Sequence, residues 1–127
     1  MESEGRTRIL IVEDEWLISA NLADLLTDWG CEVLGPAAGT RDALALLERE
    51  LPHCALLDVT LGSEKSFPVA DVLAGKGIPF VFLTGYQAAD LPQRFAEGPM
   101  IAKPIRDTDL KRALMPLIDG LAAKAPS

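Results

Sequence analysis

The sequence has few of the residues on which zinc, disulfide and histidine chemistry depend. Its 127 residues include one histidine, His53, and two cysteines, Cys31 and Cys54. The two cysteines have neither the spacing of a zinc site nor a paired framework. We therefore expect both thiols to be reduced and to pack as small apolar side chains.

The chain also lacks an excess of basic residues and any long apolar segment. It carries 12 Lys and Arg against 19 Asp and Glu, which gives a formal net charge of -7 at pH 7. Binding to nucleic acid or to an anionic membrane needs clustered Lys and Arg, so we expect neither. No apolar run approaches the roughly 20 residues of a membrane span. Residues 1–5 are polar and acidic, unlike a secretory signal, and we expect a cytoplasmic protein.

The composition is typical of a globular protein. Hydrophobic residues make up 49% of the chain and charged residues 24%. The length suits one compact domain and is too short for two ordinary ones. We expect a single domain over residues 1–127, with a core at about 7–121 and frayed termini.

Apolar runs and helical patterns alternate along the chain. The apolar runs predict five strands, near residues 9–12, 32–34, 54–58, 78–84 and 100–102. Apolar residues at helical spacing predict five helices, near residues 16–29, 40–51, 67–76, 87–97 and 107–121. The helix at 87–97 has the weakest pattern and should be short or shifted. A polar loop is expected at 62–66, after the third strand.

This alternation predicts a doubly wound α/β domain, with a five-stranded parallel sheet and helices on both faces. Right-handed crossovers leave few topologies, and we expect the flavodoxin-like strand order 2-1-3-4-5. That order places the carboxyl ends of the first, third and fourth strands side by side. The residues at those ends are Glu13, Asp14, Asp58 and Thr84. Lys103, after the fifth strand, would reach in from the flank.

These strand ends predict a site for phosphoryl chemistry. Three carboxylates placed together repel one another unless a cation compensates. Oxygen ligands without His or Cys select Mg²⁺, or Mn²⁺, over Zn²⁺. An aspartate, a metal, the Thr84 hydroxyl and the Lys103 ammonium suit phosphorylation of Asp58, which would attack phosphorus while the other groups neutralise charge. The ordinary alternatives are that Asp58 only caps a turn, that the acidic run 13–15 is favourable charge at a helix terminus, that Thr84 only ends a strand, and that Lys103 is a solvated lysine.

Four segments resemble a known family, the receiver domains of two-component response regulators. They are residues 9–15, 56–59, 82–86 and 102–104, in the order and at the separations of that family. The resemblance covers essentially the whole chain. It implies a signalling domain that assists its own phosphorylation and dephosphorylation, and not an enzyme in the ordinary sense.

The resemblance also implies roles for the strand-end residues. Asp58 is similar to the phosphoacceptor, Asp14 to the direct Mg²⁺ ligand and Glu13 to a ligand that acts through water. Thr60 resembles the residue whose backbone carbonyl completes the metal contacts of the protein. Thr84 and Lys103 resemble the pair that contacts the phosphoryl group.

Two positions bear on how a signal would be relayed. Many receivers carry an aromatic residue three positions before the lysine, and Met100 stands there in this chain. Tyr86, two residues after Thr84, would lie close enough to shield the phosphoryl group from water, to move with Thr84, or simply to pack on the loop surface. Whether Tyr86 takes part in the mechanism or only packs on the loop surface is left open.

The implied partners are a histidine kinase or a histidine phosphotransfer protein, and a downstream protein target; a homodimer is left open. His53 is not the donor, because five strand residues at about 3.3 Å each place it roughly 16 Å from Asp58. Other functions remain as alternatives: an interaction module of the same fold without phosphorylation, a small Mg²⁺-dependent phosphatase, or a flavin carrier. Thr60 replaces the second acid of such phosphatases, and the acidic run 13–15 would repel the phosphate of a flavin.

Overall fold

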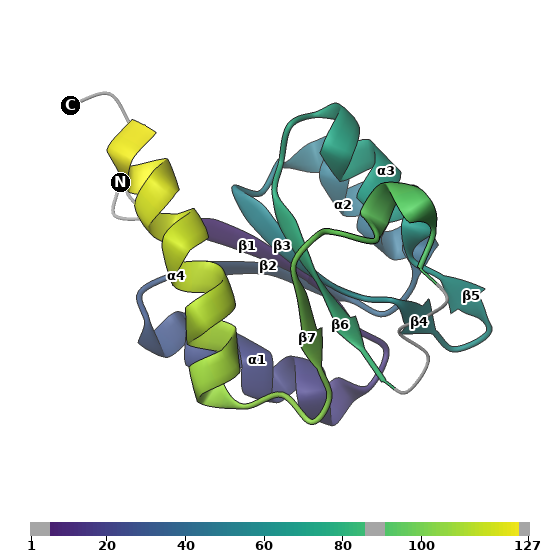
Figure 1. The fold of residues 1–127 in the computed structure, drawn as a ribbon, viewed down its shortest axis with the longest axis horizontal. Helices are drawn as coiled ribbons and strands as arrows, with labels where there is room; N and C mark the ends of the chain where they lie inside the picture. Colours follow the sequence, from purple (N-terminus) through teal and green to yellow (C-terminus); the bar gives the residue numbers. More distant parts are fainter. Residues whose placement is uncertain (1–5, 86–90, 125–127) are drawn as a thin grey trace.

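The structure is a computed structural model that describes residues 6–85 and 91–124 (Figure 1). Its centre is a five-stranded sheet in the order β2-β1-β3-β6-β7, and each neighbouring pair is parallel. The strands are β1 (Arg8–Val12), β2 (Glu32–Ala37), β3 (Cys54–Asp58), β6 (Phe80–Thr84) and β7 (Met100–Ala102). Because β6 and β7 are the fourth and fifth strands of this sheet, the predicted order 2-1-3-4-5 is confirmed.

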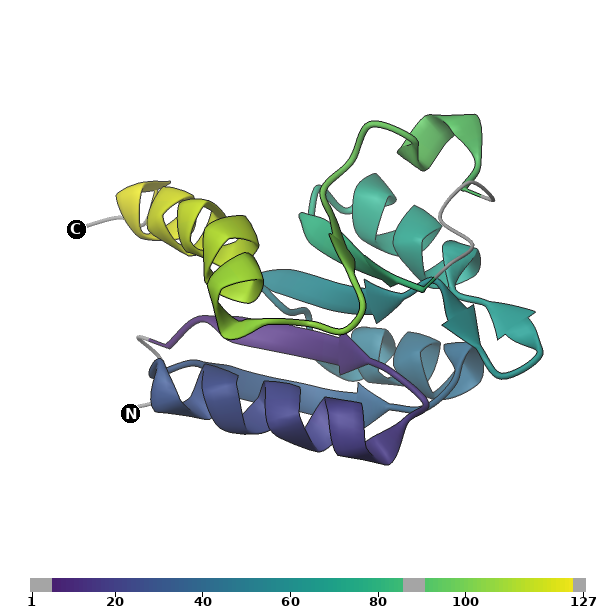
Figure 2. The same ribbon diagram turned by 60° about the horizontal axis from the view of Figure 1, so that its bottom comes forward.

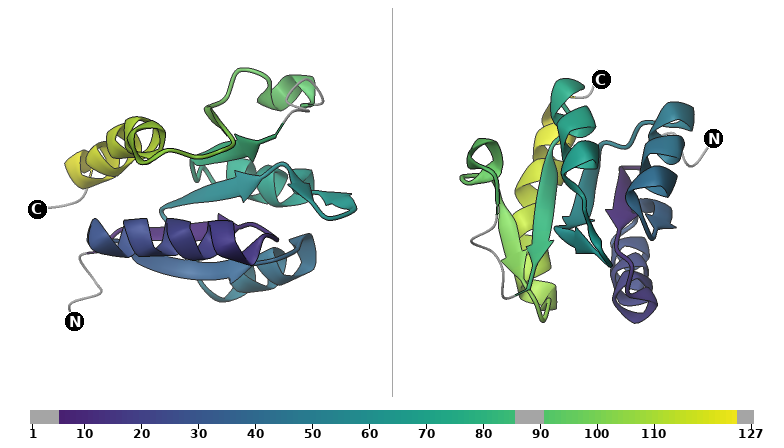
Figure 3. Two further views of the ribbon diagram at one scale, coloured as in Figure 1. Left: turned by 90° about the horizontal axis from the view of Figure 1, so that it is seen from below. Right: turned by 90° about the vertical axis from the view of Figure 1, so that its right-hand side faces the viewer.

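Two helices cover each face of the sheet (Figures 1 and 3). The helices are α1 (Trp16–Asp28) and α4 (Asp107–Lys124) on one face, and α2 (Thr40–Arg49) and α3 (Phe67–Gly75) on the other. Successive strand side chains point to opposite faces, so Ile9 and Ile11 pack under α1 and α4 while Leu10 and Val12 pack under α2 and α3. Burial on both faces explains the uninterrupted apolar runs of the strands.

Two smaller expectations concern the cysteines and the membrane. Cys31 and Cys54 are both free and buried, as the sequence predicted. None of the helices in the described ranges is long and apolar enough to cross a bilayer.

The helix expected at 87–97 is only a short element in the part of that segment that the structure describes, in line with the expectation that it should be short or shifted. Residues 86–90 lie outside the described ranges, and from 91 onward the segment contains only the 3-10 helix Gln93–Phe95. Pro92 precedes this short helix in an extended conformation, with φ -58° and ψ 152°. A long helix needs an apolar face over several turns, whereas this segment buries one side chain, Phe95.

Contacts with distant parts of the chain, and not a continuous helical face, fix the position of this segment. The ring of Phe95 packs against Phe67, Phe80 and Phe82, with ring centroids 5.9, 5.9 and 5.4 Å away. Arg94 forms two hydrogen bonds to the carboxylate of Asp71 on α3, at 2.9 and 3.0 Å. Residues distant in the chain therefore fix its position.

The chain after Asp58, in contrast, has more regular secondary structure than the sequence predicted. Instead of a polar loop, β4 (Thr60–Leu61) and β5 (Glu64–Lys65) form an antiparallel hairpin that projects beyond the carboxyl end of β3 (Figure 2). Gly62 begins the turn with φ +63°, a conformation that glycine adopts without strain. The pair Gly62-Ser63 is a turn signal typical of two-residue hairpins.

Strand β2 continues through residues 35–36, where the sequence predicted its end. The register shifts there, because Leu10 pairs with Leu34 whereas Val12 pairs with Ala37. Gly35 has φ +89° at this irregularity. The shift lets the Ala37 carbonyl accept a 2.9 Å hydrogen bond from the backbone N–H of Glu13. An irregular second strand thus positions the first acidic residue after β1.

We predict that Gly35→Ala destabilises the protein by about 2–4 kcal/mol. An alanine there would have a strained backbone at positive φ, and its methyl group would overlap neighbouring backbone atoms. A Cβ at Gly35 would lie 2.7 Å from the Ala37 nitrogen and 3.1 Å from the Ile11 oxygen. Gly75→Ala is the control, since a Cβ there meets no atom within 4 Å, and it should stabilise by up to about 1 kcal/mol. Urea unfolding measures both, and equal midpoints for the two variants would contradict the prediction.

Candidate functional site

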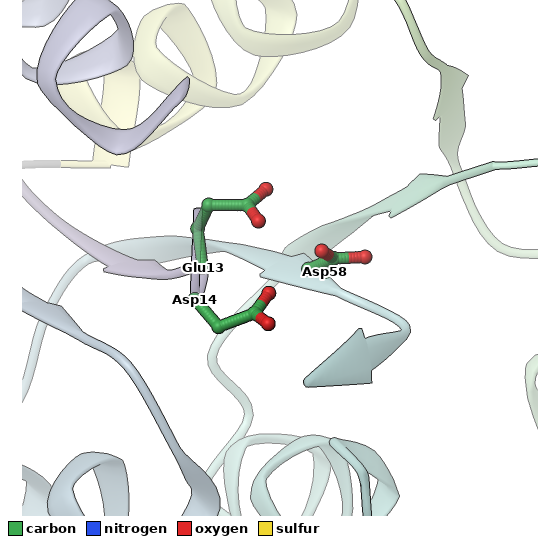
Figure 4. A group of neighbouring side chains, drawn as sticks. All are labelled: Glu13, Asp14 and Asp58. Carbon is green, nitrogen blue, oxygen red and sulfur yellow. The ribbon is translucent and has the colours of Figure 1, made fainter. Parts of the chain in front are cut away.

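Three carboxylates meet where β1 and β3 end. Val12 pairs with Leu57, so the next residues, Glu13 and Asp58, leave the two strands side by side. One carboxylate oxygen from each of Glu13, Asp14 and Asp58 lies within 4.8 Å of the other two. Figure 4 shows the side chains of Glu13 and Asp14 pointing toward Asp58. Glu13 and Asp58 are buried, and Asp14 is exposed. The sheet therefore brings together the three acids that the sequence predicted to meet.

Lys103 supplies the positive charge of this cluster. Its Nζ lies 2.8 Å from an Asp58 oxygen, 3.1 Å from a Glu13 oxygen and 3.1 Å from a Glu15 oxygen. Its backbone N–H donates a 2.8 Å hydrogen bond to the Thr84 carbonyl, which fixes the start of its loop. An ammonium has three N–H donors, so the three carboxylates can occupy all of them.

Burial and crowding change the acid–base properties of the cluster. Burial, with a further contribution from the neighbouring Asp58, raises the pKa of Glu13 to about 8. For Lys103, burial acts to lower the pKa, but the hydrogen bonds to Asp58 and Glu13 outweigh it and leave the pKa raised. In the metal-free protein, Lys103 is therefore cationic at neutral pH and Glu13 retains its proton.

Thr60 and Thr84 lie next to the carboxylates. The backbone N–H of Thr60 donates a 3.3 Å hydrogen bond to Asp58. Thr84 is buried at the end of β6, one residue beyond Leu83, the register partner of Asp58.

An open pocket of about 420 Å³ lies over the cluster. Its lining residues are Asp14, Glu15, Asp58, Thr60, Gly62, Gly85 and Lys103. The predicted phosphoacceptor and its lysine thus share one solvent-accessible space.

Of the two positions considered for signal relay, the structure describes only Met100. Tyr86 lies outside the described residues. Met100 is 40% exposed on β7, where it alternates with the buried Ile101. It lines a surface groove together with Asp109 and Arg112, and not the acidic pocket. A role for Met100 or Tyr86 in relaying a signal stays a prediction.

The placement of His53 agrees with its exclusion as a phosphodonor to Asp58 of the same chain. His53 immediately precedes β3, whereas Asp58 is the last residue of that strand. Its Nδ1 accepts a 2.8 Å hydrogen bond from the backbone N–H of Arg8. This histidine therefore helps to align the start of β3 with β1.

Two residues of the site were not predicted from the sequence. Glu15 contacts Lys103, and the acidic run 13–15 directly before a helix was the available signal. Lys65 donates a 3.0 Å hydrogen bond to the Thr60 side chain from the facing strand of the hairpin. The Gly62-Ser63 turn was the signal for that pairing.

The donor set fits a divalent magnesium or manganese ion. The three acids offer oxygen ligands, which hard cations prefer. The Oε1 atom of Glu13 is buried and accepts no hydrogen bond of good geometry within the described residues. Its nearby cation is Lys103, at 3.1 Å. A buried carboxylate oxygen without a well-aligned hydrogen bond, beside two further carboxylates, suits a cation site.

Comparison with known proteins agrees with this geometry. Residues 9–115 match the response regulator receiver domain family, and the chain belongs to that family. Proteins of this class are signalling domains with an acidic pocket for Mg²⁺.

Among the relatives, the chain is 34% identical over 111 residues to the transcriptional regulatory protein PdtaR of Mycobacterium tuberculosis, covering 84% of this chain and 54% of PdtaR. It is 32% identical over 123 residues to the phyllosphere-induced regulator PhyR of Methylorubrum extorquens, covering 90% of this chain and 44% of PhyR. The chain thus spans about half the length of these two relatives. The solution structure of SdrG from Sphingomonas melonis Fr1 matches with a TM-score of 0.79 and 41% identity, over 89% of this chain and 97% of SdrG.

The raised pKa of Glu13 predicts that the stability of the metal-free protein depends on pH. The ordinary pKa is 4.5 and the folded value is about 8, so between these values the folded state binds the extra proton and the free energy of unfolding falls as pH rises. Glu13→Gln removes this titration. From pH 6 to pH 9, the variant should gain about 1–2 kcal/mol relative to the unmodified protein.

Urea unfolding in EDTA at both pH values tests this expectation. Glu48→Gln, on the exposed side of α2, is the matched control because it removes a carboxylate away from the site. If both variants follow the same pH dependence, the assignment of the proton to Glu13 is wrong.

Proposed function

We propose that residues 1–127 form one receiver domain, in which Asp58 accepts a phosphoryl group from a phosphohistidine and thereby changes the affinity of the domain for a protein partner. The observation that supports this most is the placement of the Asp58 carboxylate, buried between Lys103 and two further acids and still open to a pocket. Neither a capping aspartate nor a solvated lysine needs that arrangement.

The proposed reaction is a direct transfer between two proteins. An oxygen of Asp58 attacks phosphorus, the O–P bond forms, and the P–N bond to the donor imidazole breaks with its electron pair returning to nitrogen. Mg²⁺ bound by the acidic cluster would neutralise charge on the transferring oxygens. Lys103, held beside Asp58 at 2.8 Å, is placed to contact one of these oxygens, and the Thr84 hydroxyl would contact another.

The metal roles are those that the family resemblance implies, and the exposure and charge of the residues are compatible with them. Asp14 is exposed and directed at the cluster, so it would bind the ion directly. Glu13 is buried and paired with Lys103, which suits a ligand acting through water. The Thr60 carbonyl would add a further ligand at the start of the hairpin.

The donor would be a histidine kinase or a histidine phosphotransfer protein, and the output would be binding to a downstream protein. An interaction module of the same fold that is not phosphorylated is the second candidate. It would need neither the Lys103–Asp58 contact nor the cluster of three carboxylates, and the presence of both favours phosphorylation. A homodimer is compatible with either function.

We predict that acetyl phosphate and Mg²⁺ add one phosphoryl group to the protein and that EDTA prevents the addition. Asp58→Asn should abolish the gain in intact mass, because an amide cannot act as the nucleophile. Asp24→Asn is the matched control, because it makes the same substitution at an exposed position of α1. Labelling of Asp58→Asn at the rate of the unmodified protein would exclude Asp58 as the acceptor.

We also predict that Asp14→Ala weakens Mg²⁺ binding by more than about 100-fold and Glu13→Ala by about 10-fold, since a direct ligand contributes more than one acting through water. Trp16, which is 77% exposed and two residues from Asp14, provides a fluorescence signal for the titration. Equal losses in the two variants would mean that the ligand roles are assigned wrongly.

A further inference from the structure

The β4–β5 hairpin holds a second ammonium group against Thr60, a residue that lines the acidic pocket. Thr60 pairs with Lys65 across the hairpin, and the Lys65 Nζ donates a 3.0 Å hydrogen bond to the Thr60 hydroxyl. Thr60 itself lines the pocket, and its N–H lies 3.3 Å from an Asp58 oxygen. Thr60 thus contacts both Lys65 and the proposed phosphoacceptor Asp58, although Lys65 and Asp58 are seven positions apart in the chain.

The hairpin is fixed to the rest of the domain, so the position of Lys65 is defined. The Glu64 carboxylate accepts a 3.2 Å hydrogen bond from the Thr40 N–H at the start of α2, and the Thr40 hydroxyl donates to the Lys65 carbonyl at 3.4 Å. Leu61 is buried beneath the hairpin. These contacts fix the backbone of Lys65, while its four-carbon side chain keeps its freedom to reorient.

The charged residues that line the pocket are mainly acidic, which bears on the role of Lys65. The acidic residues lining the pocket are Asp14, Glu15 and Asp58, and among the described lining residues Lys103 is the one cation. Lys103 is already in contact with three carboxylates. An incoming phosphoryl group therefore meets a rim of like charge and an inner cation that is already paired. Lys65 is exposed and donates to one neutral hydroxyl, so its charge is not neutralised by a carboxylate among the described residues.

We propose that Lys65 is a specificity-determining residue for phosphoryl transfer, whose ammonium attracts and contacts the outer oxygens of the donor phosphoryl group as it enters the pocket. This inference rests on the proposed function of Asp58. The same charge acts against Mg²⁺, because two cations close together repel. Lys65 therefore favours donors with two negative charges and lowers the affinity for the metal.

The test compares two small donors that differ in net charge at neutral pH, acetyl phosphate with a net charge of two negative units and phosphoramidate with one, because its nitrogen carries a positive charge; both are used at saturating Mg²⁺. Lys65→Gln should slow phosphorylation by acetyl phosphate about 3–10-fold at low salt. It should slow phosphorylation by phosphoramidate only about 2–3-fold, because the net charge of that donor is half as large. The loss should shrink toward about 2-fold at 0.5 M salt, because ions screen exposed charges. Lys65→Arg should keep the rate of the unmodified protein.

A Mg²⁺ titration by calorimetry separates this role from a purely structural one. Removing a positive charge next to the ion should raise the affinity of Lys65→Gln for Mg²⁺ about 2–3-fold. If Lys65 only held the hairpin, its loss would loosen Thr60, weaken Mg²⁺ binding and slow both donors equally. That result would overturn the proposal.

Lys76→Gln is the matched control, because it removes the same charge from an exposed lysine just after α3. It should leave both donor rates and the Mg²⁺ affinity unchanged. If the unmodified protein gains a phosphoryl group on Asp58 but Lys65→Gln reacts at the same rate with acetyl phosphate, the role of Lys65 is refuted and the proposed function stands. If Asp58 of the unmodified protein is not labelled, the proposed function itself fails.

Discussion

The contact of the Lys103 ammonium with three carboxylates is the interaction on which the site depends. Asp58 and Glu13 are buried at adjacent strand ends, where two unpaired negative charges would be costly. Lys103, 2.8 and 3.1 Å from them, offsets their repulsion, and the proton retained by Glu13 lowers the charge further. The metal-free domain thus keeps its acids together at neutral pH, and a divalent cation can take over part of that task.

The scaffold creates this concentration of charge because parallel strands all end at one edge. The apolar segments of β1, β3 and β6 are covered by helices on both faces, so the chain can place polar groups beyond their carboxyl ends without disturbing the core. Smaller irregularities then adjust the site. The register shift at Gly35 allows β2 to bind the backbone of Glu13, and the hairpin after Asp58 forms one side of the pocket.

Much of the fold and most of the site followed from local patterns. The uninterrupted apolar runs predicted strands buried on both faces, and the strand order followed from connection rules. The meeting of Glu13, Asp14, Asp58 and Lys103 was a consequence of that order, and the structure confirms that they lie together. The helix expected at 87–97 is reduced in its described part to the short 3-10 helix Gln93–Phe95, because the side chain of Phe95 packs into an aromatic cluster and does not continue a helical face.

What the sequence by itself determined was therefore the sheet, its order and the residues at its carboxyl edge, since these depend on periodicities of a few residues. Only the tertiary structure decided the contacts between distant segments. The Glu15–Lys103 ion pair joins residues 88 positions apart, and the Glu64 contact to the start of α2 joins residues 24 apart. Residue spacing does not encode such contacts, because their geometry exists only after the strands and helices have packed into one arrangement.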